Sequence, residues 1–348
     1  MSRVRAVLLF VAVSVAATGA VAARAIGDPE PLPRDLEATE VTLAPLPIDA
    51  QKPTTTTTLP TTTAPPPTAP PTTVPPPPAA IADVLAGARP VAAGDPAALA
   101  DQITQVERVI RDPAAPADWV VAAGRVQQMA YRQLGVHPEW DADVNANLPP
   151  ELVQSVAWQA AARREFRSMI TRVSDTLPAW RIVDPLPVDE LLGYYHEAEA
   201  TYGVPWNVLA AVNLVESGMG RIVGLSTAGA QGPMQFIPGT WARYGMGGDV
   251  WDPHDAIMGA ANYLAANGGN QGTLDGINNA LFHYNNDNRY VRAVLDYASV
   301  MAEDPNTYRG FHAWQIVYFS TAGDIILPTG YEQLESIPVT DYLAAHPQ

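Results

Sequence analysis

The sequence contains no cysteine among its 348 residues. This absence excludes a disulfide framework, a thiolate nucleophile and a lipid anchor attached through cysteine. Histidine is scarce as well, and the six histidines show no spacing of the H-E-x-x-H type that zinc sites use. We therefore predict neither a metal site nor a cofactor.

Basic residues are also few. Lysine and arginine together number 20 against 36 aspartates and glutamates, the formal net charge is -16, and Lys52 is the single lysine. Such a chain cannot assemble a basic patch that neutralises phosphate groups. We therefore expect no nucleic-acid partner.

The amino-terminal residues predict export. Arg3 and Arg5 precede an apolar run over residues 6–23, and small residues at 20–25 offer cleavage sites. The length of the run lies on the border between a cleaved signal peptide and an uncleaved membrane anchor, so both alternatives stay open for residues 1–26. In either case we expect the protein in the cell envelope, secreted or anchored by this segment.

Residues 27–79 are rich in proline and threonine and predict a disordered linker. Runs such as 54–58 and 75–78 cannot bury enough apolar surface to fold. Proline-rich sequence extends by about 3.1 Å per residue, so residues 52–78 would span on the order of 80 Å. This length suits a spacer that crosses part of a cell envelope.

Residues 80–180 predict a helical region. Apolar residues at helical spacing indicate one helix that begins at Asp95-Pro96, a second over 118–134 that Gly135 ends, and a third over 150–173. No group of catalytic residues occurs in this region. We interpret it as a helical region used for packing or docking.

A carboxylate in an apolar helix is the most informative feature of the sequence. Residues 206–216 predict a short helix, with Pro205 suited to its first turn and glycines at 218 and 220 to stop it. Leu209, Val212 and Glu216 fall on one face of this helix. The sequence therefore predicts that Glu216 faces inward.

Burial and the negative end of the helix dipole would both disfavour the ionised form of Glu216 and raise its pKa. A carboxylic acid held in this way can donate a proton at neutral pH. The plainer alternative is a solvated glutamate at a helix end, which is the more frequent situation for an arbitrary glutamate.

Further helices follow a loop rich in glycine and small residues at 226–238. Asp252 and Pro253 begin a helix that ends near Asn267, and a second helix covers 274–284. Asp287 opens the next helix. Asp252 and Asp255 are better explained as caps of their helix than as catalysts.

Four short motifs in this part occur in an order that is typical of one family. They are V-E-S at 215–217, A-G-A-Q-G-P-M-Q-F at 228–236, W-D-P-H-D-A-I at 251–257 and H-Y-N at 283–285. Residues 185–302 thereby resemble the catalytic domain of the soluble lytic transglycosylases, whose fold is related to goose-type lysozyme. The chain as a whole resembles an exported, actinobacterial-type member of this family. The resemblance implies a mainly α protein with a lysozyme-like helical catalytic domain after the helical region.

The resemblance also implies roles for single residues. Glu216 matches the catalytic acid and base of the family. The matched substrate-binding residues are Ser217, Met234, Gln235, Tyr284 and Asn285. Two residues depart from the family pattern, Pro233 for leucine and His283 for alanine. Because the loop before the W-D-P motif keeps a single acid, Asp249, we predict no calcium.

The carboxyl-terminal residues 303–348 lose the helical pattern. Residues 314–319 and 325–327 flank a turn and predict a small β-hairpin. Its aromatic residues suit packing against the helical domain better than they suit a sugar-binding surface.

The implied reaction is cleavage of the MurNAc-GlcNAc bond of peptidoglycan with formation of 1,6-anhydro ends. A single glutamate would act first as acid and then as base, and the sugar's own 6-hydroxyl would replace water. Two alternatives stay open. One is a lysozyme-type hydrolase in which Asp249, Asp252 or Asp287 activates water, and the other is a non-catalytic wall-binding module. Expected partners are peptidoglycan glycan strands, with cell-wall or division machinery as further candidates.

Overall fold

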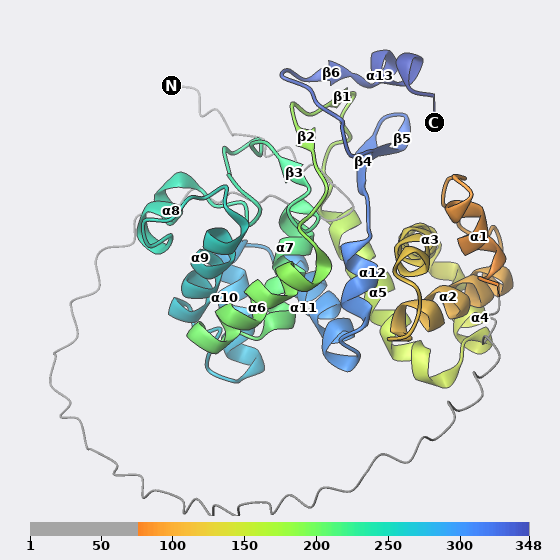
Figure 1. The fold of residues 1–348 in the computed structure, drawn as a ribbon, viewed down its shortest axis with the longest axis horizontal. Helices are drawn as coiled ribbons and strands as arrows, with labels where there is room; N and C mark the ends of the chain where they lie inside the picture. The colour runs from red at the N-terminus through yellow and green to blue at the C-terminus, as the bar shows by residue number, and fades with distance from the viewer. Residues whose placement is uncertain (1–75, 348) are drawn as a thin grey trace, which may run out of the picture. The chain divides into compact units, whose positions relative to one another are not determined.

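The structure is a computed structural model that describes residues 76–347 (Figure 1). The predicted export signal at 1–26 and the linker up to residue 75 lie outside the described residues. Within the described part, none of the helices combines the length and apolarity needed to cross a membrane. The described part is mainly helical, as the sequence predicted.

The first helices form the predicted helical region. In chain order, its elements are α1 (Ala79–Leu85), α2 (Pro96–Arg111), α3 (Ala117–Val136), the 3-10 turn η1 (Pro138–Trp140), α4 (Asp141–Asn147) and α5 (Pro150–Met169). The Asp95 side chain accepts a hydrogen bond from the Ala98 N–H at 3.0 Å and caps α2, as predicted. Two predicted ends were wrong: α3 continues through Gly135, and α5 stops at Met169, four residues before Val173.

The second group of helices surrounds Glu216. Its elements are α6 (Val188–Tyr202), α7 (Trp206–Ser217), the short strand β3 (Ile222–Val223), α8 (Pro238–Tyr244), α9 (Pro253–Ala266), α10 (Leu274–Tyr284) and α11 (Asn288–Glu303). Side chains of Asp252, Thr273 and Asp287 cap α9, α10 and α11. The predicted capping role of Asp252 is confirmed, because its Oδ1 accepts the Asp255 N–H at 3.0 Å.

The carboxyl-terminal part is more than the predicted hairpin. Its elements are α12 (Thr307–His312), β4 (Ile316–Ser320), β5 (Gly323–Leu327), β6 (Ile337–Pro338) and α13 (Val339–Ala345). β4 and β5 form the predicted antiparallel hairpin. However, β6 pairs with β1 (Thr176–Leu177), and β2 (Arg181–Ile182) pairs with β3. The carboxyl-terminal residues therefore pair with the segment that leads from α5 into the Glu216 region.

One hydrophobic core joins the first helical region to the helices around Glu216. Helix α5 packs along α11 (Figure 1), and Phe166 and Met169 of α5 belong to the same buried cluster as the apolar residues of α7. At the surface of this contact, Glu165 pairs with Arg292 at 2.6 Å. The helical region is thus a packing region fused to the Glu216 region.

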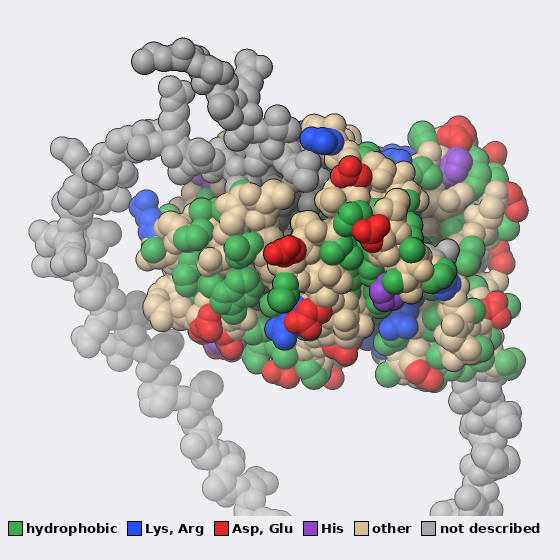
Figure 2. Space-filling model, turned by 90° about the horizontal axis from the view of Figure 1, so that it is seen from above, with side chains coloured by type: hydrophobic (Ala, Val, Ile, Leu, Met, Phe, Trp, Pro, Cys, Tyr) green, Lys and Arg blue, Asp and Glu red, His purple; other side chains and the backbone are tan. Residues whose placement is uncertain are grey.

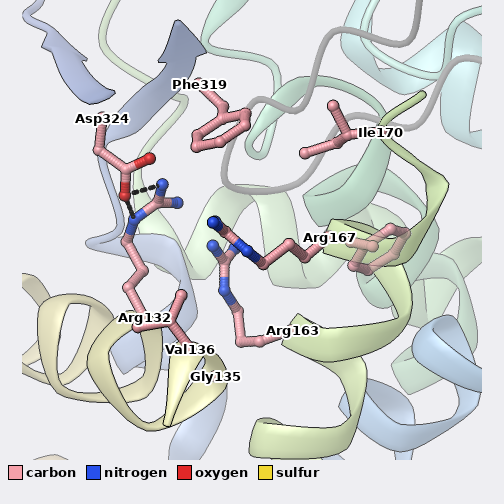
Figure 3. A pocket seen from close by; sticks show the side chains of 9 residues that line it. Arg132, Gly135, Val136, Arg163, Arg167, Ile170, Phe319 and Asp324 are labelled. Carbon is pink, nitrogen blue, oxygen red and sulfur yellow. Dashed lines mark hydrogen bonds and ion pairs between the residues drawn. The ribbon is translucent and has the colours of Figure 1, made fainter. Parts of the chain in front are cut away.

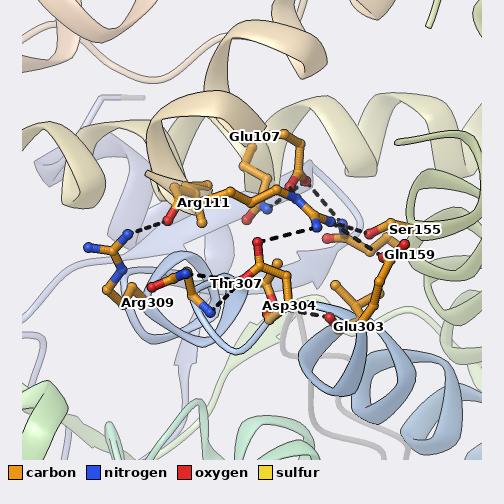
Figure 4. Close-up of polar contacts among 12 residues, drawn as sticks. Glu107, Arg111, Ser155, Gln159, Glu303, Asp304, Thr307 and Arg309 are labelled. Carbon is orange, nitrogen blue, oxygen red and sulfur yellow. Dashed lines mark hydrogen bonds and ion pairs between the residues drawn. The ribbon is translucent and has the colours of Figure 1, made fainter. Parts of the chain in front are cut away.

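A buried polar network reinforces this junction (Figure 4). The Glu107 carboxylate of α2 is fully buried and accepts hydrogen bonds from Gln127, Tyr131 and Gln159 at 2.9, 2.7 and 3.1 Å. It also pairs with Arg111 at 3.1 Å, and Arg111 lies 3.7 Å from Glu303 at the end of α11. Such a network is stable only while every buried charge keeps its partners.

We predict that Glu107→Gln lowers the free energy of unfolding by about 3 kcal/mol. The amide cannot form an ion pair with Arg111, and its NH₂ group would face side chains that are themselves hydrogen-bond donors. Urea unfolding measures this change. Glu151→Gln is the matched control, since Glu151 lies exposed near the start of α5. Equal effects of the two substitutions would contradict a structural role for the network.

Candidate active site

Glu216 lies on the last turn of a helix that is buried on all sides. Every residue of α7 from Val208 to Ser217 is buried, and the Glu216 side chain keeps 4% of its surface exposed. The predicted inward placement of Glu216 is confirmed, although α7 is buried all round and not along one stripe. The alternative of a solvated glutamate is wrong.

A left-handed turn ends α7 directly after Glu216. Gly218 has φ 64° and ψ 49°, a conformation that glycine adopts without steric cost, and its N–H bonds to the Leu214 carbonyl. A Cβ at this position would lie 2.5 Å from Ile316 of β4. The glycine therefore lets the chain leave the helix while the hairpin packs against it.

The loop 231–236 is fastened to α7 through one carbonyl group. The Pro233 carbonyl accepts hydrogen bonds from the Ser217 hydroxyl at 2.5 Å and from the Asn213 amide at 2.8 Å. Gly232 has φ 72°, and a Cβ there would lie 1.8 Å from the Val250 carbonyl oxygen. Only glycine fits at this contact, which brings the loop close to the residues that precede α9.

Two tyrosines meet the site from α10 and α11. The Tyr284 hydroxyl donates to the Met234 carbonyl at 2.7 Å and so gives the loop a second anchor besides Ser217. The Tyr290 hydroxyl donates to Glu216 Oε1, also at 2.7 Å. Among residues 76–347, the second oxygen, Oε2, has no hydrogen-bond partner, so this atom is left for a ligand.

Burial raises the pKa of Glu216 to about 8, and the Tyr290 hydrogen bond opposes this shift because it favours the charged form. The predicted direction of the pKa shift is confirmed, with desolvation as its cause. At neutral pH the side chain is therefore mainly a neutral acid. Among residues 76–347, no charged neighbour is a cause of this shift.

A comparison with models of known protein families identifies the family that the segment around Glu216 matches. Residues 193–304 match the model of the transglycosylase SLT domain. The chain carries an SLT domain. Members of this family are lytic transglycosylases, so the protein is an enzyme that acts on peptidoglycan, in agreement with the resemblance of the motifs. Comparisons with curated proteins and with solved structures gave no match.

Several motif residues of the SLT domain support the loop 231–236 beside α7. Ser217 and Met234 are fully buried, and Gln235 donates its amide to the Gly232 carbonyl at 2.9 Å within the loop. Asn285 is buried at the carboxyl-terminal end of α10. Their assignment as substrate-binding residues stays a prediction.

The sequence reasoning missed Tyr290. The motif match pointed to Tyr284, as a substrate-binding residue, whereas the hydroxyl that contacts Glu216 is that of Tyr290. Tyr290 shares one face of its helix with Val294 and Tyr297 and so resembled an ordinary core residue. A signal was available, because a buried tyrosine hydroxyl needs a polar partner.

The aspartates of the SLT domain are engaged locally. Asp249 Oδ1 accepts the Trp251 N–H, and Asp287 binds Arg289, which lowers the pKa of Asp287. Within the described residues, Asp252, His254 and Asp255 form the one group of three or more possible metal ligands whose ligand atoms all lie within 4.8 Å of one another. Asp252 caps α9, and His254 lies 3.1 Å from Glu197, so each member already serves a neighbour.

The raised pKa of Glu216 makes the stability of the enzyme depend on pH. In the unfolded chain the group ionises near its ordinary value of 4.5, whereas in the folded chain it keeps its proton up to about 8. Ionisation thus favours the unfolded state across this interval. Between pH 4.5 and about pH 8, the unfolding free energy of the wild type should therefore fall, relative to that of Glu216→Gln, by about 1.4 kcal/mol for each unit of rising pH. Above about pH 8 the difference should stay constant.

Urea unfolding of both proteins at several pH values measures this difference. Glu151→Gln serves as the control and should follow the wild type at every pH. A constant difference between wild type and Glu216→Gln across the interval would contradict the raised pKa.

A second prediction concerns Tyr290. In Tyr290→Phe the charged form of Glu216 loses its hydrogen bond, so the pKa of Glu216 should rise further. Carboxyl signals of Glu216 followed by NMR titration measure the pKa directly. In the matched variant Tyr284→Phe, which loses a bond to a carbonyl group, we expect a smaller change. A lower pKa in Tyr290→Phe would show that the hydroxyl does not stabilise the carboxylate.

Proposed function

We propose that the enzyme cleaves the MurNAc-GlcNAc bond of peptidoglycan and leaves 1,6-anhydro ends, with Glu216 as the single acid and base. The observation that carries this proposal is the buried, neutral carboxyl group with one oxygen bound to Tyr290 and the other open. The match to the SLT domain supports the class of substrate.

In the first step, Glu216 gives its proton to the oxygen of the glycosidic bond. The bond between this oxygen and the sugar carbon breaks, and the carbon takes on oxocarbenium character. Glu216 is then a carboxylate, which the Tyr290 hydroxyl stabilises through the 2.7 Å hydrogen bond. The raised pKa keeps Glu216 protonated before the first step, and the hydrogen bond stabilises the carboxylate that this step leaves behind.

In the second step, the Glu216 carboxylate removes the proton from the 6-hydroxyl of the same sugar. The hydroxyl oxygen forms a bond to the anomeric carbon, and Glu216 regains the proton with which the cycle began. No water is consumed. An internal nucleophile needs no second carboxylate to activate it, because it is already held near the reacting carbon.

The alternative function is that of a hydrolase of the same fold, which requires a second carboxylate that activates water. The candidates Asp249, Asp252 and Asp287 each accept hydrogen bonds from neighbouring backbone or side-chain donors. None of them contributes to the pKa of Glu216. These observations favour the intramolecular reaction.

We also propose that the enzyme works outside the cytoplasm, secreted or anchored by residues 1–26, because its substrate lies in the cell envelope. The Pro/Thr-rich residues 27–75 would then separate the enzyme from the membrane. The carboxyl-group chemistry above is independent of this proposal.

Glu216→Gln should reduce glycan cleavage by about 10²–10⁴-fold, since an amide can neither donate the proton nor take it back. Release of soluble fragments from purified peptidoglycan sacculi measures the rate. Glu197→Gln, an exposed change on α6 of the same domain, should keep the wild-type rate. Full activity of Glu216→Gln would refute the assignment.

Mass spectrometry of the fragments tests the product. Anhydro ends are lighter than reducing ends by one water, and they acquire no label when digestion is run in heavy-oxygen water. Labelled reducing ends would establish the hydrolase. A wild-type protein that binds sacculi without releasing fragments would indicate a wall-binding module.

A further inference from the structure

Arginines in the pocket between α3, α5 and the β4–β5 hairpin serve the packing of these elements (Figure 3). Arg132 Nε donates to Asp324 Oδ2 at 2.6 Å, and the Arg167 guanidinium lies 4.7 Å from the centre of the Phe319 ring. On the face in Figure 2, basic side chains are scattered singly among other residues. A group of polar contacts with a different character lies in the interior, between α7 and the loop 231–236.

A buried asparagine lies about one turn before Glu216 in α7. Asn213 is 1% exposed, and its side-chain amide faces two different elements. Nδ2 donates to the Pro233 carbonyl of the loop at 2.8 Å, and Oδ1 accepts from the Tyr195 hydroxyl of α6 at 2.7 Å. Because a carbonyl oxygen can only accept, the amide nitrogen must face Pro233 and the amide oxygen must face Tyr195. The amide therefore has one orientation.

The same amide directs the hydroxyl group of Ser217. Ser217 Oγ accepts the Gly220 N–H at 2.9 Å and the Asn213 amide at 3.3 Å, which uses both lone pairs of the oxygen. Its one proton goes to the Pro233 carbonyl at 2.5 Å, since the other acceptor in reach, the Asn213 carbonyl, is 3.5 Å away. Both hydrogen bonds that fasten the Pro233 carbonyl to α7 thus depend on Asn213, one directly and one through Ser217.

The loop needs these bonds because it contains a strained residue. Gln235 has φ 50°, a left-handed conformation that costs free energy for a residue with a side chain. Its backbone N–H and its side-chain amide both donate to the Gly232 carbonyl, at 3.1 and 2.9 Å. An antiparallel bridge between Gln231 and Phe236 closes the loop. Strain of this kind persists only where the surroundings hold it, so the conformation of Gln235 depends on the attachment of the loop to α7.

We propose that Asn213 is a positioning residue for glycan cleavage. It fixes the loop that carries Met234 and Gln235 on the helix that carries Glu216, so that a sugar held by the loop meets the acid in the reactive geometry. Asn213 itself is buried and acts through the Pro233 carbonyl. The proposal rests on the proposed function of Glu216, and it adds a residue that lies outside the motifs shared with the family.

A paired substitution in the full-length enzyme tests this role. Asn213→Leu alone would leave the buried Tyr195 hydroxyl with Met219 Sδ, a weak acceptor 3.4 Å away. The double variant Asn213→Leu/Tyr195→Phe replaces both partners by apolar groups of similar shape, a change that folding tolerates. On soluble glycan strands its kcat should fall by about tenfold or more, because a small misplacement of the substrate slows the reaction, and its KM should change less than about threefold.

Hydrogen exchange measures the loop without any turnover. The Phe236 N–H donates to the Gln231 carbonyl at 2.8 Å, and the Gln231 N–H donates to the Phe236 carbonyl at 2.9 Å. In the double variant these two amides should exchange about tenfold faster or more, whereas buried amides in the middle of α2 should keep their wild-type rates. Unchanged exchange at both loop amides would overturn the proposal.

Asn262→Leu is the matched control. Asn262 is another partly buried asparagine of the same domain, and its Nδ2 donates to the backbone carbonyl of Tyr244 at 3.0 Å, at the end of α8 that is farther along the chain from the loop. Its kcat should match that of the wild type. Tyr195→Phe alone, which keeps the bond from Asn213 to Pro233, should lose less activity than the double variant. Equal losses in the double variant and in either single variant would overturn the proposal, because they would indicate a general loosening of the core.

The outcomes separate this proposal from the catalytic one. Activity that survives Glu216→Gln would refute the catalytic assignment, while loop exchange and the kcat of the double variant would still decide the role of Asn213. A double variant with faster loop exchange and full kcat would overturn the positioning role and leave the assignment of Glu216 intact.

Discussion

The interaction on which the Glu216 site depends is the hydrogen bond between Tyr290 and Glu216 inside an apolar core. A carboxyl group buried at the end of α7 loses the hydration that its charged form needs, and within the described part of the chain the neighbour that restores part of this stabilisation is a neutral hydroxyl. The result is a carboxylic acid that keeps its proton at neutral pH and can still release it. Gly218, the loop 231–236 and the packing of α11 all serve to keep these two groups in contact.

Two buried glutamates, Glu107 and Glu216, have opposite electrostatic surroundings. Glu107 has Arg111 beside it and three further donors around its carboxylate, an arrangement that holds helices together. Among residues 76–347, Glu216 has no cation beside it and a single side-chain hydrogen bond, an arrangement that leaves its proton exchangeable. Because arginine would hold Glu216 as a permanent carboxylate, a shortage of basic side chains near the site is a condition of the proposed chemistry.

Sequence reasoning located the elements whose ends carry chemical signals. The helices bounded by Asp95, Gly218 and Asp287 were found because caps and a left-handed glycine act locally. The pairing of Thr176–Leu177 with Ile337–Pro338 was missed, since strands of two residues have no periodicity and their partners lie far apart in the chain. Tyr290 was missed for a related reason: its partner is set by tertiary packing, and the sequence pattern shows only a core position.

The first helical region contributes to the reaction site through the same packing. Helix α11 lies between α5 and α7, so the position of Tyr290 relative to Glu216 depends on both contacts. Arg289, the neighbour of Tyr290, is bonded to the last turn of α5, and Phe166 stacks on Tyr297 with ring centres 6.1 Å apart. Residues that lack any catalytic group thereby fix the geometry of the acid. The domain boundary that the sequence predicts near residue 180 separates sequence motifs, whereas the helices that hold Glu216 in place extend back to α5.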